Sequence, residues 1–152
     1  MLFRSVSLLE PPVALEEPSV PDPLGSVLAE LIAAGRNGDA VVHFHTSIGV
    51  PDELVAGLRD APYWPLIEAA APTLVYDTMI TESMTAEKLA AITTPALVVN
   101  SVDSDDDLRS WSAGVADALP NARHLPMRGE WHGVANDDLA PVLTEFFVGS
   151  VR

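Results

Sequence analysis

The sequence contains no cysteine and few basic residues. The absence of cysteine excludes disulfides, thiolate nucleophiles and cysteine-ligated zinc sites. Only 8 Lys and Arg stand against 22 Asp and Glu, which gives a formal net charge of −14. A surface this acidic repels phosphate backbones and anionic lipid headgroups, so we expect neither nucleic acid nor a membrane surface as a partner. The sequence also lacks a Gly-rich phosphate loop, and we expect no cofactor.

Long apolar runs are missing as well. No run approaches the ~20 residues that a membrane span needs. After Arg4, the sequence Glu10-Pro11-Pro12 interrupts any apolar segment of a secretion signal. We therefore expect a cytoplasmic protein. Hydrophobic residues make up 48% of the 152 positions, which is enough for the core of one domain and too many for a disordered chain.

The first half of the sequence predicts one strand followed by helices. Val6–Leu9 is a short apolar run typical of a buried strand, and five prolines between 11 and 23 predict an extended connector. Helical spacing and capping residues then predict four short helices, over 23–35, 39–49, 51–58 and 63–79. Asp22 and Asp39 are the expected caps of the first two helices. Leu54, Val55 and Leu58 are expected to face inward, and Pro65 and Pro72 to kink the last helix.

The second half changes to alternating strands and helices. Ala96–Val99 is a continuous apolar run, which is typical of a strand buried on both faces of a parallel sheet. A helix through Leu108, Trp111, Val115 and Leu119 follows, then a strand over Ala122–Met127 and a terminal helix. Asp137 or Asp138 should cap this last helix, so that Pro141 falls in its first turn. Right-handed crossovers make the whole an α/β protein with a parallel sheet.

Asp103 and His132 are the first candidates for chemistry. Asp103 comes just after the Ala96–Val99 strand, and His132 follows the next strand. Parallel strands end at the same edge of a sheet, where sites form, so both side chains should lie there. A carboxylate that orients an imidazole is the acid–base half of a charge-relay triad. The alternative is a surface acid and an ordinary loop histidine.

Several segments of the sequence resemble one family in order and spacing. Thr94–Asp103 is similar to the strand motif P-x-L-V-V-x-G-x-x-D of α/β-hydrolases, Leu119–Arg123 to their LPNAR segment, and Gly129–His132 to their G-x-x-H loop. Leu139–Phe147 resembles their last helix. Leu8–Pro12 resembles the Y-E-P-P strand end that precedes the helical cap of one bacterial subgroup. Residues 34–40, Trp64 and Tyr76-Asp77 resemble that cap. The resemblance covers nearly the whole chain.

The resemblance implies a serine-type hydrolase of an ester or similar small substrate. It assigns His132 as the general base and Asp103 as the acid that orients it. It also implies one incomplete domain, in which 18–85 form a helical cap inserted in a partial parallel sheet and 94–152 form the β-α-β-α core. Trp64 and Tyr76 would line the substrate cleft, although aromatic residues at such positions are more often cap core.

Two departures from the family pattern limit this interpretation. Asn100 replaces the glycine of G-x-x-D, and the G-x-S-x-G nucleophile turn, which precedes the acid and the histidine in family order, is absent. We therefore expect no activity from the chain alone, and whether it is an enzyme is left open. The alternative is a non-catalytic remnant or a binding module that keeps the cap pocket. An exposed sheet edge predicts self-association, or complementation by a partner.

Other serine and metal sites fit the sequence poorly. Ser112 lies in the helix-like run Ser110–Gly114, and Ser101 follows a strand without the glycines of a nucleophile turn. Asp103, Asp105 and Asp107 match the first ligands of a calcium loop, but Leu108 and Gly114 occupy positions that need Gly and Glu. Asp105–Asp107 fit the start of a helix instead. His43 and His45 would point to different faces of a helix, and we expect no metal.

Overall fold

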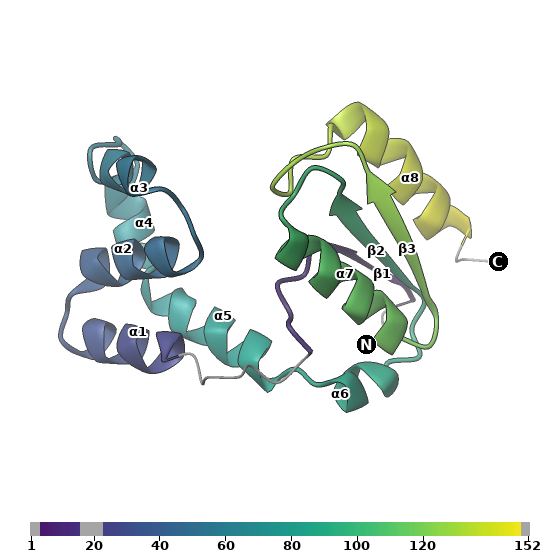
Figure 1. Ribbon diagram of the computed structural model, residues 1–152, viewed down its shortest axis with the longest axis horizontal. Helices are drawn as coiled ribbons and strands as arrows, with labels where there is room; N and C mark the ends of the chain where they lie inside the picture. The colour runs from purple at the N-terminus through teal and green to yellow at the C-terminus, as the bar shows by residue number, and fades with distance from the viewer. Residues whose placement is uncertain (1–3, 16–22, 150–152) are drawn as a thin grey trace. The chain divides into compact units, whose positions relative to one another are not determined.

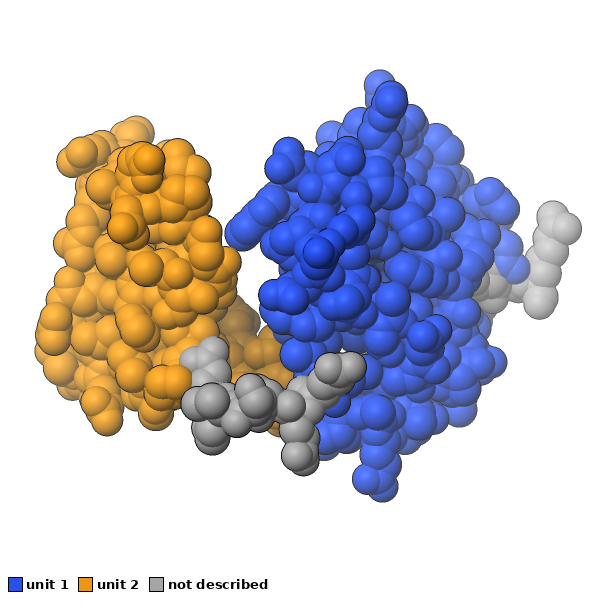
Figure 2. All heavy atoms as spheres, in the orientation of Figure 1, with its two compact units in different colours: residues 1–17, 84–152 blue, residues 18–83 orange. Residues whose placement is uncertain are grey.

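The structure is a computed structural model that describes residues 4–15 and 23–149. Along the chain, its elements are β1 (Val6–Leu9), α1 (Leu24–Ala33), α2 (Asn37–Ser47), α3 (Asp52–Arg59), α4 (Trp64–Ala70), α5 (Pro72–Ser83), α6 (Ala86–Ala90), β2 (Ala96–Ser101), α7 (Asp106–Ala118), β3 (Ala122–Met127) and α8 (Asn136–Gly149) (Figure 1). The chain divides into two compact units, one of residues 1–17 and 84–152 and one of residues 18–83 (Figure 2). The expected cap Asp22 and most of the proline connector lie outside the described residues.

The first unit is built on an open parallel sheet of three strands in the order β1-β2-β3. Val6 pairs with Ala96, and Ala96 pairs in turn with Ala122, so all three strands start level. β2 is the central strand, and all six of its residues are buried. The strands at Val6–Leu9 and Ala122–Met127 have the predicted bounds, while β2 continues two residues beyond the predicted Val99.

Alternate residues of β2 enter two separate hydrophobic clusters. Ala96 and Val98 pack with Val115 and Leu119 beside α7, on the face that α6 also covers through Leu89. Leu97 and Val99 face the other way, and their cluster takes in partly buried side chains of α8, namely Leu139, Val142, Leu143 and Phe146 (Figure 1). Burial of a large aliphatic side chain contributes about 1.5–3 kcal/mol. The apolar run therefore holds the sheet between two helical layers, as predicted for a doubly covered strand.

The helix after β2 starts where its acidic residues predict. Asp105 caps α7, and its Oδ1 accepts a hydrogen bond from the Leu108 N–H at 2.8 Å. Asp106 and Asp107 occupy the first turn, where the helix dipole favours negative charge. The three acidic residues therefore mark the start of a helix, as the sequence predicted for Asp105–Asp107.

Two helices of this unit differ from their predictions. α8 begins at Asn136, so Pro141 lies inside the helix and not in its first turn. The proline has no N–H to donate to the Asp137 carbonyl, so one backbone hydrogen bond is missing, and the helix continues on both sides of it. The short helix α6 was not predicted, because it spans only Ala86–Ala90 and buries a single large side chain, Leu89. Thr85 caps it by accepting from the Lys88 N–H at 3.2 Å.

The second unit is entirely helical in its described residues, α1 to α5. Leu24 and Leu28 of α1 pack on Ala40 of α2, together with partly buried side chains that include Leu74 of α5. The prediction of Asp39 as the cap of α2 was wrong: the helix begins at Asn37, and Asp39 accepts hydrogen bonds from Arg36 and Arg59.

Two further predictions for this helical unit need correction. Val55 of α3 is buried as expected, but Leu54 is 63% exposed. The predicted single helix over 63–79 is two helices, since the chain breaks between Ala70 and Pro72 into α4 and α5. A proline favours the start of a helix over its interior, which accounts for the break.

Candidate active site

Three segments meet at the carboxyl edge of the sheet. Glu10 directly follows β1, Ser101 ends β2, and the loop from Gly129 follows β3. The backbone ties them together: the Glu10 N–H donates to the Val99 carbonyl at 2.8 Å, and the Asp103 N–H donates to the Gly129 carbonyl at 3.0 Å. This is the edge at which parallel sheets form their sites.

The side chain of Glu10 is completely buried at this edge and faces hydrogen-bond donors on both oxygens. Oε1 accepts from the Ser101 N–H and from the Ser104 hydroxyl, each at 2.7 Å. Oε2 accepts from the His132 N–H at 2.6 Å and lies 2.9 Å from Nδ1 of the same residue. A carboxylate offers about four lone-pair directions, and here each one has a donor.

Burial and hydrogen bonding act on the charge of Glu10 in opposite directions. Burial raises the pKa of its carboxyl group. The hydrogen bonds from Ser104, Ser101 and His132 and the positive charge of the imidazole outweigh burial, so the pKa lies below its usual value. The site therefore stabilises an ionised carboxylate inside the protein.

His132 combines a fixed nitrogen with an accessible ring. Its Nδ1 faces Glu10, whereas its side chain is 47% exposed, and no described residue bonds to its Nε2. Because the carboxylate can only accept, a hydrogen bond between the neutral imidazole and Glu10 requires the proton on Nδ1. The lone pair of Nε2 is then free to take a proton from another group.

Ser104 joins the carboxylate to the histidine loop. Its hydroxyl donates to Glu10 Oε1 and accepts from the Trp131 N–H at 2.8 Å. The ring of Trp131 in turn packs edge-on against the imidazole, with a centroid separation of 6.3 Å. The buried serine therefore supports both members of the pair.

The backbone around the pair is strained. Among the described residues, the non-glycine positions with positive φ are Glu10 (44°), Trp131 (49°) and His132 (60°). Such conformations cost on the order of 1–3 kcal/mol each and gather at functional sites. All three lie in one hydrogen-bonded cluster, which marks this edge independently of any motif.

Two glycines give the histidine loop its tight turn. Gly129 has φ +148°, and a Cβ there would lie 2.6 Å from the Gly133 carbonyl oxygen. A Cβ on Gly133 would lie equally close to the Glu130 carbonyl oxygen. No side chain fits at either position, so the two glycines allow the loop to return Trp131 and His132 to the sheet.

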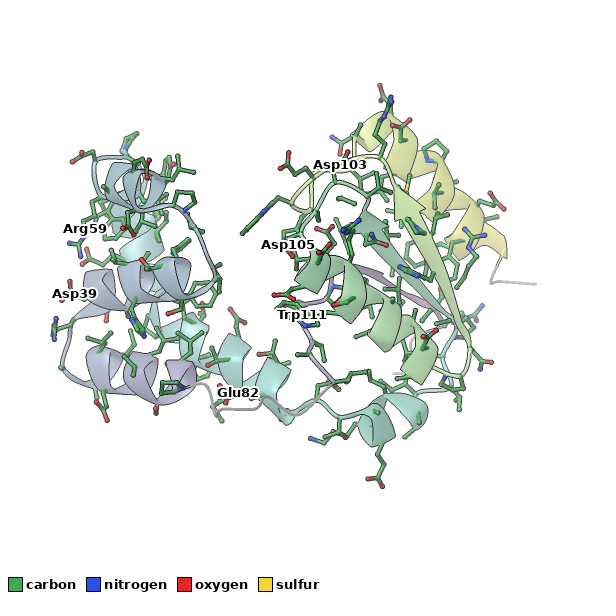
Figure 3. All side chains as sticks on the ribbon, viewed as in Figure 1. Asp39, Arg59, Glu82, Asp103, Asp105 and Trp111 are labelled. Atoms are coloured by element: carbon green, nitrogen blue, oxygen red, sulfur yellow. The ribbon has the colours of Figure 1, made fainter. Side chains whose placement is uncertain are left out.

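The structure places Asp103 and His132 at the same edge, as predicted, but it does not pair their side chains. Asp103 lies on the loop between β2 and α7, just before the helix cap Asp105 (Figure 3). Its side chain is exposed, and within the described ranges nothing hydrogen-bonds to it. The catalytic role of Asp103 therefore stays a prediction.

Glu10 is the residue that sequence reasoning missed. It carries the Y-E-P-P resemblance but was given no role. The edge argument that selected Asp103 applies equally to Glu10, because Glu10 is the first residue after a parallel strand.

Asn100, which replaces the family glycine, belongs to β2 and has a structural role. Its Oδ1 accepts from Nε2 of His124 at 2.7 Å, and its amide donates to the Ser101 carbonyl. Ser112 lies inside α7 and donates to the Leu108 carbonyl at 2.8 Å, so it occupies no strand-to-helix turn. Ser101 has a buried hydroxyl at the end of β2.

The predicted substrate-binding residues both lie in the helical unit. Trp64 has the Arg59 guanidinium 5.4 Å from its ring centroid and packs close to Gly38, an arrangement typical of structural aromatic residues. Tyr76 is 61% exposed. The unit contains a shallow hollow of about 400 Å³, and neither residue lines it; its lining includes Arg36, Asp39 and His43. The substrate role of Trp64 and Tyr76 stays a prediction.

Asp39, which lines this hollow, lies beside Arg59, whose Nη2 is 2.9 Å from Asp39 Oδ1 (Figure 3). Hydrogen bonds from Arg36 and Arg59 lower the pKa of the Asp39 carboxyl group. Within residues 4–15 and 23–149, no group of three His, Asp or Glu side chains comes together in a way that could hold a metal ion. His45 Nδ1 donates instead to the Val41 carbonyl of its own helix at 2.7 Å.

Comparison with known proteins identifies the fold. No protein-family profile and no curated protein sequence matches the chain. Among solved structures, an α/β hydrolase from Sphaerobacter thermophilus is 40% identical, with a TM-score of 0.77, and the match covers 95% of this chain. A non-heme bromoperoxidase from Mycobacterium tuberculosis is 17% identical, with a TM-score of 0.56 over 97% of this chain, and shows a shared fold only.

The chain spans 58% of the length of each of these two structures. The described part of the chain has no helix both long enough and apolar enough to cross a bilayer. Three observations indicate the same fold: the open parallel sheet, the helices on both of its faces, and the 40% identity to a solved α/β hydrolase. The chain belongs to the α/β-hydrolase fold family.

Proposed function

We propose that this chain carries the general base of a serine-type hydrolase that acts on an ester or similar small substrate. The observation that supports this most directly is His132, whose Nδ1 lies 2.9 Å from a buried carboxylate oxygen while its side chain is 47% exposed. An imidazole held at Nδ1 and open at Nε2 is arranged to accept a proton from a nucleophile.

In this proposal, a serine hydroxyl attacks the carbonyl carbon of the substrate while His132 Nε2 takes the hydroxyl proton. The proton then passes from Nε2 to the leaving alcohol, which departs and leaves an acyl-serine. A water molecule, deprotonated by His132 in the same way, then attacks the acyl-serine; the serine oxygen leaves and takes the proton from Nε2, and the carboxylic acid product is released. The buried negative charge of Glu10 stabilises the imidazolium that forms in both halves of the reaction.

The proposal places the serine outside these 152 residues, on the same polypeptide or on another, because the sequence contains no G-x-S-x-G. Residues 18–85 are proposed to act as the cap, with Trp64 and Tyr76 contacting the substrate. The family motif assigns the orienting carboxylate to Asp103, and the structure adds Glu10 as a second carboxylate at the same edge. The proposal needs one of the two to face His132 during the reaction.

A fusion protein tests the proposal. The chain is joined to the part of the Sphaerobacter thermophilus hydrolase that the match leaves uncovered, in the order that the parts have in that hydrolase. We expect a fluorophosphonate to label the fusion and a p-nitrophenyl ester to be hydrolysed, with both lost in His132→Ala. The control is Glu130→Gln, an exposed position in the same loop. A folded fusion whose hydrolysis survives His132→Ala contradicts the proposal.

A further inference from the structure

We propose that Glu10, to which no motif assigns a role, is the carboxylate that fixes the orientation and tautomer of His132, and that Ser104 holds Glu10 in place. This inference rests on the proposed function, because it concerns the same histidine. It makes Glu10 a positioning residue, which acts through the imidazole and not on the substrate.

The two carboxylate oxygens of Glu10 contact different parts of the site. Oε1 is held by the Ser101 N–H and the Ser104 hydroxyl, both at 2.7 Å, and these bonds fix the carboxylate relative to β2. Oε2 is held by the His132 N–H at 2.6 Å and faces Nδ1 at 2.9 Å. One oxygen therefore anchors the group while the other contacts both the backbone and the ring of the histidine.

Asp103 is the competing carboxylate. Nδ1 of a neutral imidazole has one proton to donate, and Glu10 Oε2 already accepts it. Asp103 could take over only by displacing a completely buried glutamate from its donors, or by occupying Nε2, which a nucleophile needs. The exposed side chain of Asp103 has no described partner that would hold it in either position.

The chain adopts unfavourable backbone at both ends of this contact. Glu10 and His132 have φ values of +44° and +60°, and Trp131, between Ser104 and the imidazole, has +49°. Hydrogen bonds to Glu10 and Ser104 hold all three residues in place. Strain of this kind persists only where surrounding contacts over-determine it.

A glutamine at position 10 distinguishes positioning from simple packing. Its amide has the same shape as the carboxylate but must direct an NH₂ group toward one set of donors. With NH₂ toward His132, Nδ1 can only accept, and the neutral ring must move its proton to Nε2. The nitrogen that should receive the nucleophile's proton is then blocked, as in an Asp→Asn change of a serine-protease triad.

Nitrogen NMR of the imidazole at alkaline pH, on the 152-residue chain, tests the inference directly. His132→Gln assigns the His132 signals among the four histidines. We expect wild-type His132 to carry its proton on Nδ1, with Nε2 unprotonated. In Glu10→Gln, we expect this preference for Nδ1 to be lost. In Glu10→Asp, we expect part of the preference to remain, because the negative charge is kept. A wild-type ring protonated on Nε2 overturns the inference.

Asp103→Asn is the comparison that decides between the two carboxylates. If Glu10 fixes the tautomer, Nδ1 stays protonated in Asp103→Asn and in the exposed control Glu130→Gln. If Nδ1 loses its proton in Asp103→Asn, the inference is overturned, even where Glu10→Gln fails to fold. The measurement needs no nucleophile, so its result is independent of whether the fusion protein hydrolyses an ester.

Discussion

Among single residues, the buried charge of Glu10 has the largest effect on this sheet edge. Glu10 is an ionised group with no exposed surface, and it is tolerated because four donors from three residues face it. Removing the charge without removing the donors leaves buried N–H and O–H groups unsatisfied, which costs about 1–3 kcal/mol. Glu10 therefore links the stability of this sheet edge to the geometry of His132.

This link predicts a pH dependence of stability. The pKa of Glu10 is lowered in the folded protein, so its contribution is complete above the unfolded pKa of about 4.3 and is lost as pH falls through the lower folded value. Urea unfolding followed by circular dichroism should show wild type losing stability over this acid range. Glu10→Gln should be about 1–3 kcal/mol less stable at pH 7, and the gap should close in acid. A gap that stays constant with pH contradicts the ionised carboxylate.

The sequence predicted the histidine of the site and the edge at which it lies, but not its partner. His132 follows from its position after a parallel strand and from the G-x-x-H loop. Glu10 is 122 positions away in sequence, and the contact exists only because β1 and β3 flank the same central strand. The positive φ values at Glu10 and His132 also depend on that tertiary cluster, since neither residue favours them locally.

At the scale of elements, the histidine loop depends on its glycines. Gly129→Ala places a methyl group 2.6 Å from the Gly133 carbonyl oxygen at φ +148°. We expect a loss of about 1–3 kcal/mol and displacement of His132 from Glu10. Gly57→Ala is the matched control, because Gly57 is exposed in α3 with nothing within 4 Å. It should stabilise by up to about 1 kcal/mol. Equal effects in urea unfolding would refute the tight-turn explanation.

The start of α7 gives a second prediction at this scale. Asp105→Ala removes the cap that accepts the Leu108 N–H, so we expect about 1 kcal/mol of destabilisation. Asp107→Ala, in the first turn without a cap bond, should cost less because it loses only an interaction with the helix dipole. Thermal unfolding compares the two variants. If Asp107→Ala costs more than Asp105→Ala, the assignment of the cap is wrong.

Elements with strong patterns were predictable and weak ones were not. Ala96–Val99 was identified because a strand buried on both faces has a continuous apolar run. Ala122–Met127 is half-exposed and was placed by the break at Pro120-Asn121 before it and the glycine loop after it. α6 was missed since five residues give no helical period, and the start of α2 was misplaced because Asp39 serves two arginines instead of a cap. Pro141 was expected in a first turn, but α8 begins at Asn136, and the exposed polar residues 136–138 carry no apolar period that would mark that start.

At the scale of the whole molecule, the sheet has an open edge. β1 pairs only with β2 among the described strands. The N–H groups of Val6 and Glu10 donate to the β2 side, so the alternating N–H of Ser7 points to the open side. Such an edge can pair with another chain.

We therefore expect the 152-residue chain to self-associate at tens of micromolar, as measured by light scattering. Ser7→Pro removes a donor from the open side without removing one from the β2 side, so it should reduce association. The control is Glu130→Gln, at an exposed position away from β1, which should leave association unchanged. A dispersed wild-type monomer would contradict the prediction of self-association, but it would not bear on the roles proposed for His132 and Glu10.

We propose that His132, held by Glu10, is the base of a hydrolase. The decisive measurement is the turnover number of the fusion protein toward a p-nitrophenyl ester, in His132→Ala, Glu10→Gln and Asp103→Asn. We expect His132→Ala to lower kcat by roughly 10⁶-fold and Glu10→Gln by roughly 10⁴-fold, with little change in KM. The loss in Asp103→Asn should be at least tenfold smaller. A loss in Asp103→Asn equal to that of His132→Ala, with Glu10→Gln near wild type, would contradict the account.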